Sequence, residues 1–283
     1  MQNTGQRHTK EIKCELYNDH FQNYKRYQIP KAQLVIADIP YNIGKNAYGS
    51  NPMWYNGGDN KNGESKHANS TFFDTDENFN IAEYMHFCNS MLIKEPKERG
   101  KAPAMIVFCS FEQMQMVIEI GKKHGFMNNF PLIFIKNYSP QVLKANMRIL
   151  GATEYAIVLF RDKLPKFNNN GKMVYNWMNW ERESTVDKVH PTQKPIAVLK
   201  NLIRLFTDKG DTVIDPVAGS ATTLRAAFEL GRNAYGFEIK KEFCKLAREK
   251  ILSSFHQEMF CETECVNHDT KIESEVLFDV SDN

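Results

Sequence analysis

The sequence predicts an α/β fold, with a mostly parallel β-sheet and helices on both of its faces. Short apolar runs rich in β-branched residues alternate with longer amphipathic stretches, the pattern of repeated β-α units. Two of these runs, 34–38 and 212–214, lead into an acidic residue with a proline close behind it. Open α/β sheets bind ligands outside the carboxyl ends of their strands, so a functional site is expected at that edge.

The first part of the chain is predicted to form five strands and two longer helices. In order, these are a strand at 11–18, a short helix or turn at 20–30, a strand at 34–38, a helix at 81–94, a strand at 104–109, a helix at 112–124 and strands at 131–136 and 154–160. The connection between the last two strands lacks a crossover helix, so these strands are expected to run antiparallel.

The second part adds two strands and three helices after a polar segment. A helix is predicted at 193–207, with Thr192 as its N-cap residue. The remaining expected elements are a strand at 212–214, a helix ending near Leu230, a strand at 233–239 and a helix at 240–253.

The charge distribution divides the chain into a basic body and an acidic tail. Residues 258–283 contain eight acidic residues and one lysine, a balance of −7, which leaves +9 for residues 1–257. A basic body suits a polyanion partner. The tail lacks periodicity and is expected to be disordered. Residues 42–80 are rich in Asn, Gly and Ser and are interpreted as a mobile flap beside the site, with a disordered loop without a role as the alternative.

Membrane, secreted and metal-dependent classes find no support in the composition. No apolar run approaches the roughly 18–20 residues of a membrane helix. The N-terminal sequence lacks the apolar region of a secretory signal. The six cysteines form no regular framework, which favours a reducing cytoplasm. Cys261, Cys265 and His268 are one ligand short of a closed zinc site, so no metal is predicted.

Two motifs carry the expected chemistry. Asp38-Ile39-Pro40-Tyr41 provides a carboxylate and an aromatic ring at a strand end. DPVAGSATT, at 215–223, combines a strand end, a turn of small residues and a helix N-terminus, where a ligand can approach the backbone closely. It matches neither a dinucleotide fingerprint nor a P-loop. Glu238 follows at the next strand end and can accept both hydroxyls of a ribose, so a nucleoside-type cofactor with a zwitterionic end is predicted.

These motifs resemble those of the amino-methylating DNA methyltransferases that use S-adenosylmethionine. DIPY is similar to their catalytic D/N/S-P-P-Y motif, DPVAGSATT to their D-P-F-x-G-S-G-T-T cofactor motif, and HPTQKP, at 190–195, to the motif that precedes the cofactor strand. The catalytic motif comes first, as in the β subgroup, and the resemblance covers roughly residues 13–253. It implies a Rossmann-like, seven-stranded, mostly parallel sheet with circularly permuted motif order over 1–257.

The resemblance also assigns residue roles. The Asp38 carboxylate and the Ile39 carbonyl would accept the N–H bonds of an exocyclic amine, and Tyr41 would stack on a base that has left the duplex. Lys194 is assigned to the cofactor carboxylate, Asp19 to the adenine amine and Glu238 to the ribose. The full set of implied cofactor-binding residues is Asp19, His190, Thr192, Gln193, Lys194, Asp215, Pro216, Ala218, Gly219, Ser220 and Glu238.

Three positions depart from the family pattern. Ile39 replaces the usual first proline, which removes the fixed φ that aims its carbonyl. Ile39→Pro is therefore expected to preserve or raise activity, and Asp38→Ala to abolish it. Val217 replaces a phenylalanine, and Ala221 replaces a glycine, so the turn must accommodate a Cβ.

The first residue of the catalytic motif indicates the target. In this family Asp goes mostly with adenine N6, so duplex DNA containing adenine is the expected substrate. The alternatives are cytosine N4, an RNA or protein amine, and a non-catalytic subunit that binds nucleic acid. The family is also compatible with a homodimer and a cognate restriction endonuclease. DNA contacts are expected from the 42–80 flap, from 137–153 with Lys136 just before it, and from 161–189, a short target-recognition insertion. The residues expected to make them are Lys136, Tyr138, Lys144, Arg148, Lys163, Lys166, Lys172 and Arg182.

Overall fold

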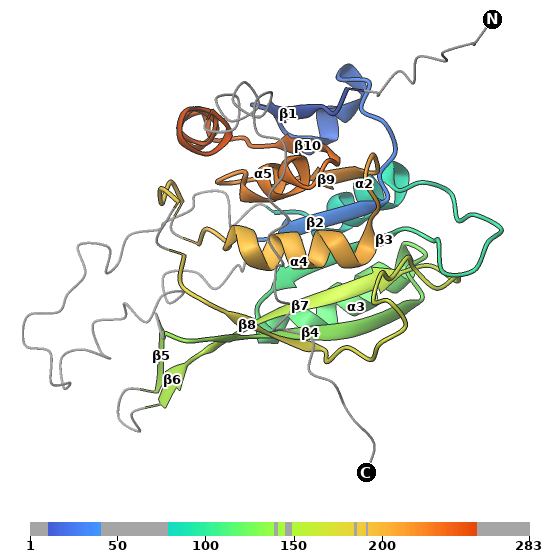
Figure 1. Cartoon of the computed structure of the whole chain (residues 1–283), viewed down its shortest axis with the longest axis horizontal. Helices are drawn as coiled ribbons and strands as arrows, with labels where there is room; N and C mark the ends of the chain where they lie inside the picture. Colours follow the sequence, from blue (N-terminus) through green and yellow to red (C-terminus); the bar gives the residue numbers. More distant parts are fainter. Residues whose placement is uncertain are drawn as a thin grey trace, which may run out of the picture.

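An eight-stranded sheet forms the centre of the computed structural model, with strand order β1-β10-β9-β2-β3-β7-β4-β8 (Figure 1). The structure describes residues 11–40, 79–138, 141–144, 149–183, 186–190 and 192–253, with the backbone alone for 141–144 and 149–150. The strands are β1 (Cys14–Tyr17), β2 (Leu34–Asp38), β3 (Ala104–Cys109), β4 (Asn128–Lys136), β7 (Thr153–Phe160), β8 (Trp177–Trp180), β9 (Thr212–Asp215) and β10 (Asn233–Phe237). A separate hairpin pairs β5 (Gln141–Lys144) with β6 (Ile149–Gly151).

Helices cover both faces of this sheet, as predicted. They are α2 (Ile81–Met91), α3 (Met114–Lys123), α4 (Ile196–Phe206), α5 (Thr222–Glu229) and α6 (Lys241–Leu246), which continues as a π-helical turn over Ala247–Leu252. A 3-10 helix at Phe21–Arg26 follows β1. Among the described residues, no helix has both the length and the apolar character needed to cross a membrane.

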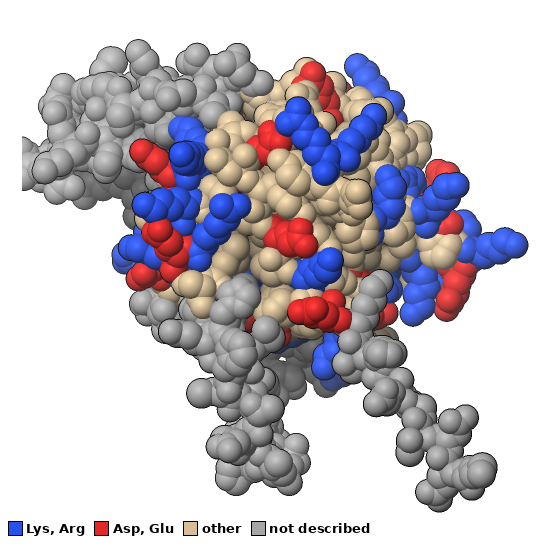
Figure 2. Space-filling view, turned by 90° about the horizontal axis from the view of Figure 1, so that it is seen from above, with Lys and Arg blue, Asp and Glu red and all other residues tan. Residues whose placement is uncertain are grey.

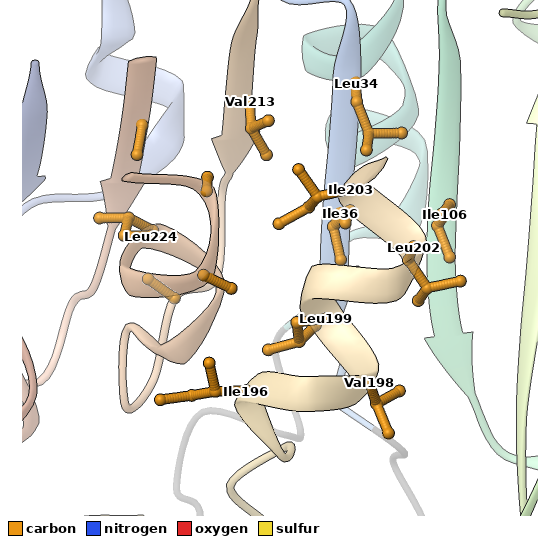
Figure 3. Close-up of a cluster of buried hydrophobic side chains, with 14 of the residues drawn as sticks. Leu34, Ile36, Ile106, Ile196, Val198, Leu199, Leu202, Ile203, Val213 and Leu224 are labelled. Carbon is orange, nitrogen blue, oxygen red and sulfur yellow. The ribbon is translucent and has the colours of Figure 1, made fainter. Parts of the chain in front are cut away.

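The side chains of β2 show why two layers of helices are needed. Leu34 and Ile36 belong to one buried cluster, and Val35 and Ala37 belong to the other. Successive side chains of a strand point to opposite faces, so a continuous apolar run requires cover on both sides. Helix α4 covers the Leu34 face, where its Leu199, Leu202 and Ile203 lie over the strands (Figure 3). Helix α2 packs on the Val35 face.

Strand β7 is the one antiparallel member of the sheet in the described part of the chain. It pairs antiparallel with both β3 and β4, whereas the other five neighbouring pairs are parallel. The predicted antiparallel arrangement of 131–136 and 154–160 is therefore confirmed. The expected count of seven strands is corrected to eight. The additional strand is β8, which lies in a segment that the sequence suggested was irregular, and it pairs with β4 at the sheet edge.

Helix α4 begins later than predicted. Its N-cap residue is Pro195, and the first helical residue is Ile196. The ring of a proline disfavours the helical conformation of the residue before it, so Lys194 cannot begin the helix. The Ile196 N–H donates to the Glu183 carboxylate at 3.0 Å, which supplies the capping interaction that Thr192 was expected to make.

The chain leaves β2 and β9 in opposite directions across the sheet. These strands are neighbours, yet β2 leads to β3 on one side and β9 leads to β10 on the other. Such a topological switch point opens a crevice at the carboxyl ends of the two strands. On the face drawn in Figure 2, lysine and arginine residues are mixed with acidic ones. Charge on that face therefore does not by itself indicate a ligand surface.

Candidate active site

Three carboxyl groups lie at the carboxyl ends of three adjacent strands. Asp38 ends β2, Asp215 ends β9 and Glu238 follows β10. The strands are in parallel register, with Val35 opposite Ile214 and Gly236 opposite Asp215. The DIPY and DPVAGSATT motifs, far apart in sequence, therefore meet at the switch point of the sheet.

The turn that follows Asp38 is held by strand β3 and by the core. The Ile39 N–H donates to the Phe108 carbonyl oxygen at 3.2 Å. The Ile39 side chain is only 2% exposed and packs in the cluster on the α2 face. Tyr41 lies outside the described residues, so the structure gives no account of its stacking role.

Gln113 is a second support of this turn, and our sequence reasoning did not select it. Its Nε2 donates to the Pro40 carbonyl at 2.9 Å, and its Oε1 accepts the Ser110 N–H at 3.1 Å. The sequence contains a pattern that could have pointed to Gln113, because Ser110 and Gln113 have the S-x-x-Q spacing of a capping box. What could not be seen locally is that the same amide reaches across to the turn that follows Asp38.

Lys194 contacts Asp38 directly. Its Nζ lies 2.6 Å from Asp38 Oδ2, and its side chain is 7% exposed. The ammonium also lies 5.3 Å from the centre of the Phe108 ring and 5.6 Å from that of Trp180. Burial lowers the pKa of Lys194, but the charges of Asp38 and Glu154 and the hydrogen bond to Asp38 raise it above its ordinary value overall. This contact differs from the expected one with a cofactor carboxylate.

The second motif buries an acid under a tight turn. Asp215 is buried and accepts the Val217 N–H at 3.1 Å. Burial raises the pKa of Asp215 to about 7, the charges of Asp38 and Glu238 add to the rise, and hydrogen bonds from Thr223 and Val217 oppose it. The carboxyl is therefore partly protonated near neutral pH, and a cation beside it would favour ionisation.

Glu238 connects the turn to the next helix. Its Oε2 accepts the Gly219 N–H at 2.9 Å, and its Oε1 accepts the Lys240 N–H at 2.7 Å. Burial raises the pKa of Glu238, and these two hydrogen bonds oppose the rise. Gly219 has φ 50°, a conformation that favours glycine. Ala221 has φ 60°, so the Cβ that we expected this turn to accommodate sits on strained backbone.

The HPTQKP segment lies against this turn. A Cβ on Gly219 would be 3.6 Å from the His190 ring. Burial and the charges of three nearby lysines lower the pKa of His190 to about 4, so its ring is neutral at physiological pH. Gln193 braces the segment, since its Oε1 accepts the Val189 N–H and its Nε2 donates to the Asp187 carbonyl.

The remaining expected cofactor residues contact other residues of their own segments or of β10. The Thr192 hydroxyl lies 3.1 Å from His190 Nδ1, and Ser220 Oγ lies 3.2 Å from Thr222 Oγ1. The Ala218 N–H donates to the Phe237 carbonyl. Pro216 follows Asp215 in the turn.

Asp19 differs from its expected role. Its Oδ1 accepts the His20 N–H at 2.7 Å and the Asn23 side-chain amide at 2.6 Å. Its Oδ2 accepts the Tyr27 hydroxyl at 2.6 Å, and Arg26 lies 3.7 Å away. The hydrogen bonds from Tyr27 and Asn23 lower the pKa of Asp19. This carboxylate organises the 3-10 helix after β1. A hydrogen bond from an adenine amine would be a further bond to the same carboxylate.

Three lysines expected to bind DNA lie near the amino ends of the parallel strands, away from the three carboxyl groups. Lys166 is buried, and its ammonium lies 2.8 Å from Asp208 and 2.7 Å from Asp211, which precede β9. Lys163 donates to the Pro96 carbonyl, before β3. Lys172 closes a turn next to Asn168, whose backbone N–H donates to the carbonyl of Leu205 at the C-terminal end of α4.

Three other expected DNA contacts lie at the same edge as the site. Lys136 ends β4, and its 7% exposed side chain is paired with Glu154. The Lys136 ammonium lies 6.0 Å from the centre of the Tyr138 ring, and the Arg182 guanidinium lies 5.9 Å from it. Of these, Arg182 is exposed. The side chain of Lys144 and all of Arg148 lie outside the described structure.

Comparisons with known proteins agree with this arrangement. The DNA methylase family profile for N6 and N4 amino-methyltransferases matches residues 32–249. The chain is 26% identical over 274 residues to DNA adenine methyltransferase YhdJ of Escherichia coli K12, covering 87% of this chain and 85% of that protein. It is 24% identical to the type II methyltransferase M.HpaI of Haemophilus parainfluenzae, covering 79% and 69%.

Solved structures show the same fold. The M1.HpyAVI–SAM complex superposes with a TM-score of 0.59 at 22% identity, covering 84% of this chain and 98% of that one. The cytosine-N4-specific PvuII DNA methyltransferase superposes with a TM-score of 0.60 at 15% identity, covering 89% and 91%. With the family profile spanning both motifs and the strands between them, the chain belongs to the N6/N4 DNA methylase family.

Proposed function

We propose that this protein transfers a methyl group from S-adenosylmethionine to the N6 amine of an adenine that has left the DNA duplex. The observation that carries the proposal is the position of Asp38 at the end of β2, beside the Asp215 turn at the end of β9. This arrangement supports a role for Asp38 as an amine acceptor beside a turn suited to a cofactor. Its adenine-methylating relative YhdJ supports the choice of base.

The proposed chemistry follows from the weakness of the nucleophile. The lone pair of an exocyclic base amine is delocalised into the ring. Two acceptors on its N–H bonds, the Asp38 carboxylate and the Ile39 carbonyl, would localise that pair toward the methyl donor. The methyl group would then move by direct in-line displacement, so catalysis depends on position and electrostatics and needs no covalent enzyme intermediate.

The residues around the Asp215 turn fit S-adenosylmethionine. A buried carboxyl with a pKa of about 7 suits the amino group of the methionine end. Glu238 offers carboxylate oxygens at the next strand end, where a ribose can be bound. Gly219 adds no side chain at the turn, which allows a ligand to approach the backbone. When bound, the cofactor would supply the activated methyl group.

Mass spectrometry of digested DNA tests this function. Unmethylated duplex DNA is incubated with the protein and S-adenosylmethionine, and modified nucleosides are quantified. We expect N6-methyladenine with the wild-type protein and none with Asp38→Ala, provided that calorimetry shows that the variant still binds the cofactor. An active Asp38→Ala protein would contradict the mechanism.

Cytosine N4 is the second candidate target, because the family includes both kinds of enzyme and the PvuII enzyme is cytosine-specific. N4-methylcytosine as the sole product would establish it. RNA and protein amines are tested by the same assay with those substrates. A protein that binds DNA but no S-adenosylmethionine would instead be the non-catalytic subunit. The type II methyltransferases among the relatives also make a cognate endonuclease a proposed partner.

A further inference from the structure

The contact between Lys194 and Asp38 joins two motifs that lie far apart in the sequence. Asp38 belongs to the catalytic turn, and Lys194 belongs to the HPTQKP segment, 156 residues later in the chain. Asp38 follows Leu34 and Ile36 in the alternation of β2, so its side chain points to the face covered by α4. Lys194 precedes Pro195, the N-cap residue of α4, which brings its ammonium to that face.

We propose that Lys194 is a positioning residue that holds the Asp38 carboxylate ionised and oriented toward the amine, and that it does not bind the cofactor carboxylate. This inference rests on the proposed methyl transfer, in which Asp38 is an acceptor for the target amine.

The surroundings of Lys194 favour one position of its ammonium. Phe108 and Trp180 place aromatic rings within 6 Å of Nζ, a range in which rings attract cations. Trp180 itself is buried at the end of β8. Moving the ammonium to a cofactor would give up these ring contacts and the ion pair with Asp38. Separating this pair is unfavourable, because the Lys194 ammonium, whose side chain is 7% exposed, would remain poorly solvated.

A fixed ammonium would help Asp38 in two ways. The terminal torsion of an aspartate side chain has a broad energy well, so an ion pair at one oxygen restricts its rotation. A neighbouring positive charge also favours the ionised carboxylate, which only accepts hydrogen bonds, over the acid, which would compete as a donor. Carboxylate oxygens accept more than one hydrogen bond each, and the Asp38 side chain is 24% exposed, so an amine can still reach it.

If Lys194 positions Asp38, its substitution has the opposite kinetic effect from the one expected if it binds the cofactor carboxylate. The variants are Lys194→Gln and Lys194→Met, the second of which keeps an unbranched apolar stem between the rings. Lys123→Gln, on an exposed lysine of α3, is the matched control. Thermal unfolding shows which variants are folded. Calorimetry then gives the S-adenosylmethionine Kd of the protein without DNA, and single-turnover assays at saturating cofactor and DNA give the rate of methyl transfer.

A positioning role predicts a rate lower by about 10- to 100-fold, with a cofactor Kd within about twofold of wild type. It also predicts a double-mutant cycle in which Lys194→Gln has little further effect on the rate when Asp38 is already Asn. Lys194→Gln should change the Kd of decarboxylated S-adenosylmethionine by the same factor as it changes the Kd of the normal cofactor.

A cofactor Kd raised by about tenfold or more with an unchanged saturated rate would overturn the inference and make Lys194 a carboxylate ligand. An active wild type with fully active Lys194 variants would also overturn it, while leaving the proposed function intact. A wild-type protein that methylates no substrate would overturn the proposed function itself.

Discussion

The backbone N–H of Ile39 donates a hydrogen bond to the carbonyl oxygen of Phe108, 3.2 Å away on the neighbouring strand. A proline at this position, as in the usual family motif, would have no hydrogen to donate. The bond extends the pairing of β2 with β3 beyond Asp38, and the isoleucine side chain fills the core behind it. In this chain the hydrogen bond and the buried side chain provide the restraint that a proline ring provides elsewhere.

Ile39→Pro is therefore expected to destabilise the protein. This effect on stability is separate from the sequence-based expectation that the substitution preserves or raises activity. Loss of the hydrogen bond and of buried side-chain volume should lower the free energy of unfolding by about 2–4 kcal/mol. Denaturant unfolding measures this change. Ile39→Val keeps the N–H and should cost about 1 kcal/mol. Equal stability of the proline variant and the wild type would show that the bond to Phe108 is dispensable.

Gln113→Ala should slow methyl transfer while leaving the cofactor affinity unchanged. The substitution releases the Pro40 carbonyl, which loses its bond from Nε2, and so loosens the turn that carries the Ile39 acceptor. A displacement of about 1 Å in a reacting group can lower the rate by up to about 100-fold. For the loss of an indirect support such as Gln113, we expect a rate about 10-fold lower. Single-turnover assays measure the rate. Gln115→Ala, on the exposed side of α3, is the control. A wild-type rate for Gln113→Ala would contradict the supporting role.

The affinity for S-adenosylmethionine should increase with pH across neutrality. The pKa of Asp215 is about 7 in the folded protein and 3.8 ordinarily, so its carboxylate forms only as pH rises through 7. An ammonium ligand binds the ionised form, and about a tenfold gain in affinity between about pH 6 and about pH 8 follows. Calorimetry in buffers of different ionisation enthalpy would show proton release on binding. Asp215→Asn should bind more weakly and without this pH dependence, and an unchanged pH profile in that variant would exclude Asp215 as its source.

The same raised pKa affects folding. The neutral Asp215 carboxyl contributes stability that is fully present below the unfolded-state pKa and is lost as pH rises through the folded-state value of about 7. The unfolding temperature of the protein without cofactor should therefore fall across this interval. Asp215→Asn should remove the part of this decrease in unfolding temperature that comes from Asp215. A matched Glu238→Gln variant identifies the part that comes from Glu238.

Lys166→Met should reduce stability and leave DNA binding unchanged. Its buried ammonium is shared between Asp208 and Asp211 at the edge of the sheet opposite the site. Because Asp208 is half exposed, loss of the pairs should cost about 1–3 kcal/mol, less than for a fully buried cluster. Titration of DNA binding at several salt concentrations should give the wild-type slope. Arg182→Gln, at the catalytic edge, should instead reduce that slope by about one phosphate contact. A reduced slope for Lys166→Met would restore its role in DNA binding.

Much of the fold could be predicted from the sequence because its central strands have strong local signals. The runs at 34–37 and 104–109 are apolar throughout, and such runs are stable only when both faces are covered. Strand β8, with the sequence WMNW, has no comparable pattern. Its pairing with β4 depends on the path of residues 161–176, which contact residues that precede β3 and β9. A short window of sequence does not contain that information.

Local sequence was enough to select the residues on which the proposed chemistry depends. Asp38, at the end of 34–38, and the small-residue turn after 212–214 belong to the proposed catalytic and cofactor motifs, because the reacting groups and the backbone freedom they need are local properties. Tertiary structure decided the partners of those groups. The bonds of Asp38 to Lys194, of Ile39 to Phe108 and of Gln113 to Pro40 span long stretches of chain. These bonds form only when strand pairing and burial in the folded sheet offset the conformational entropy lost in bringing distant segments together. Neither the composition nor the spacing of the motifs shows which distant residues then become neighbours.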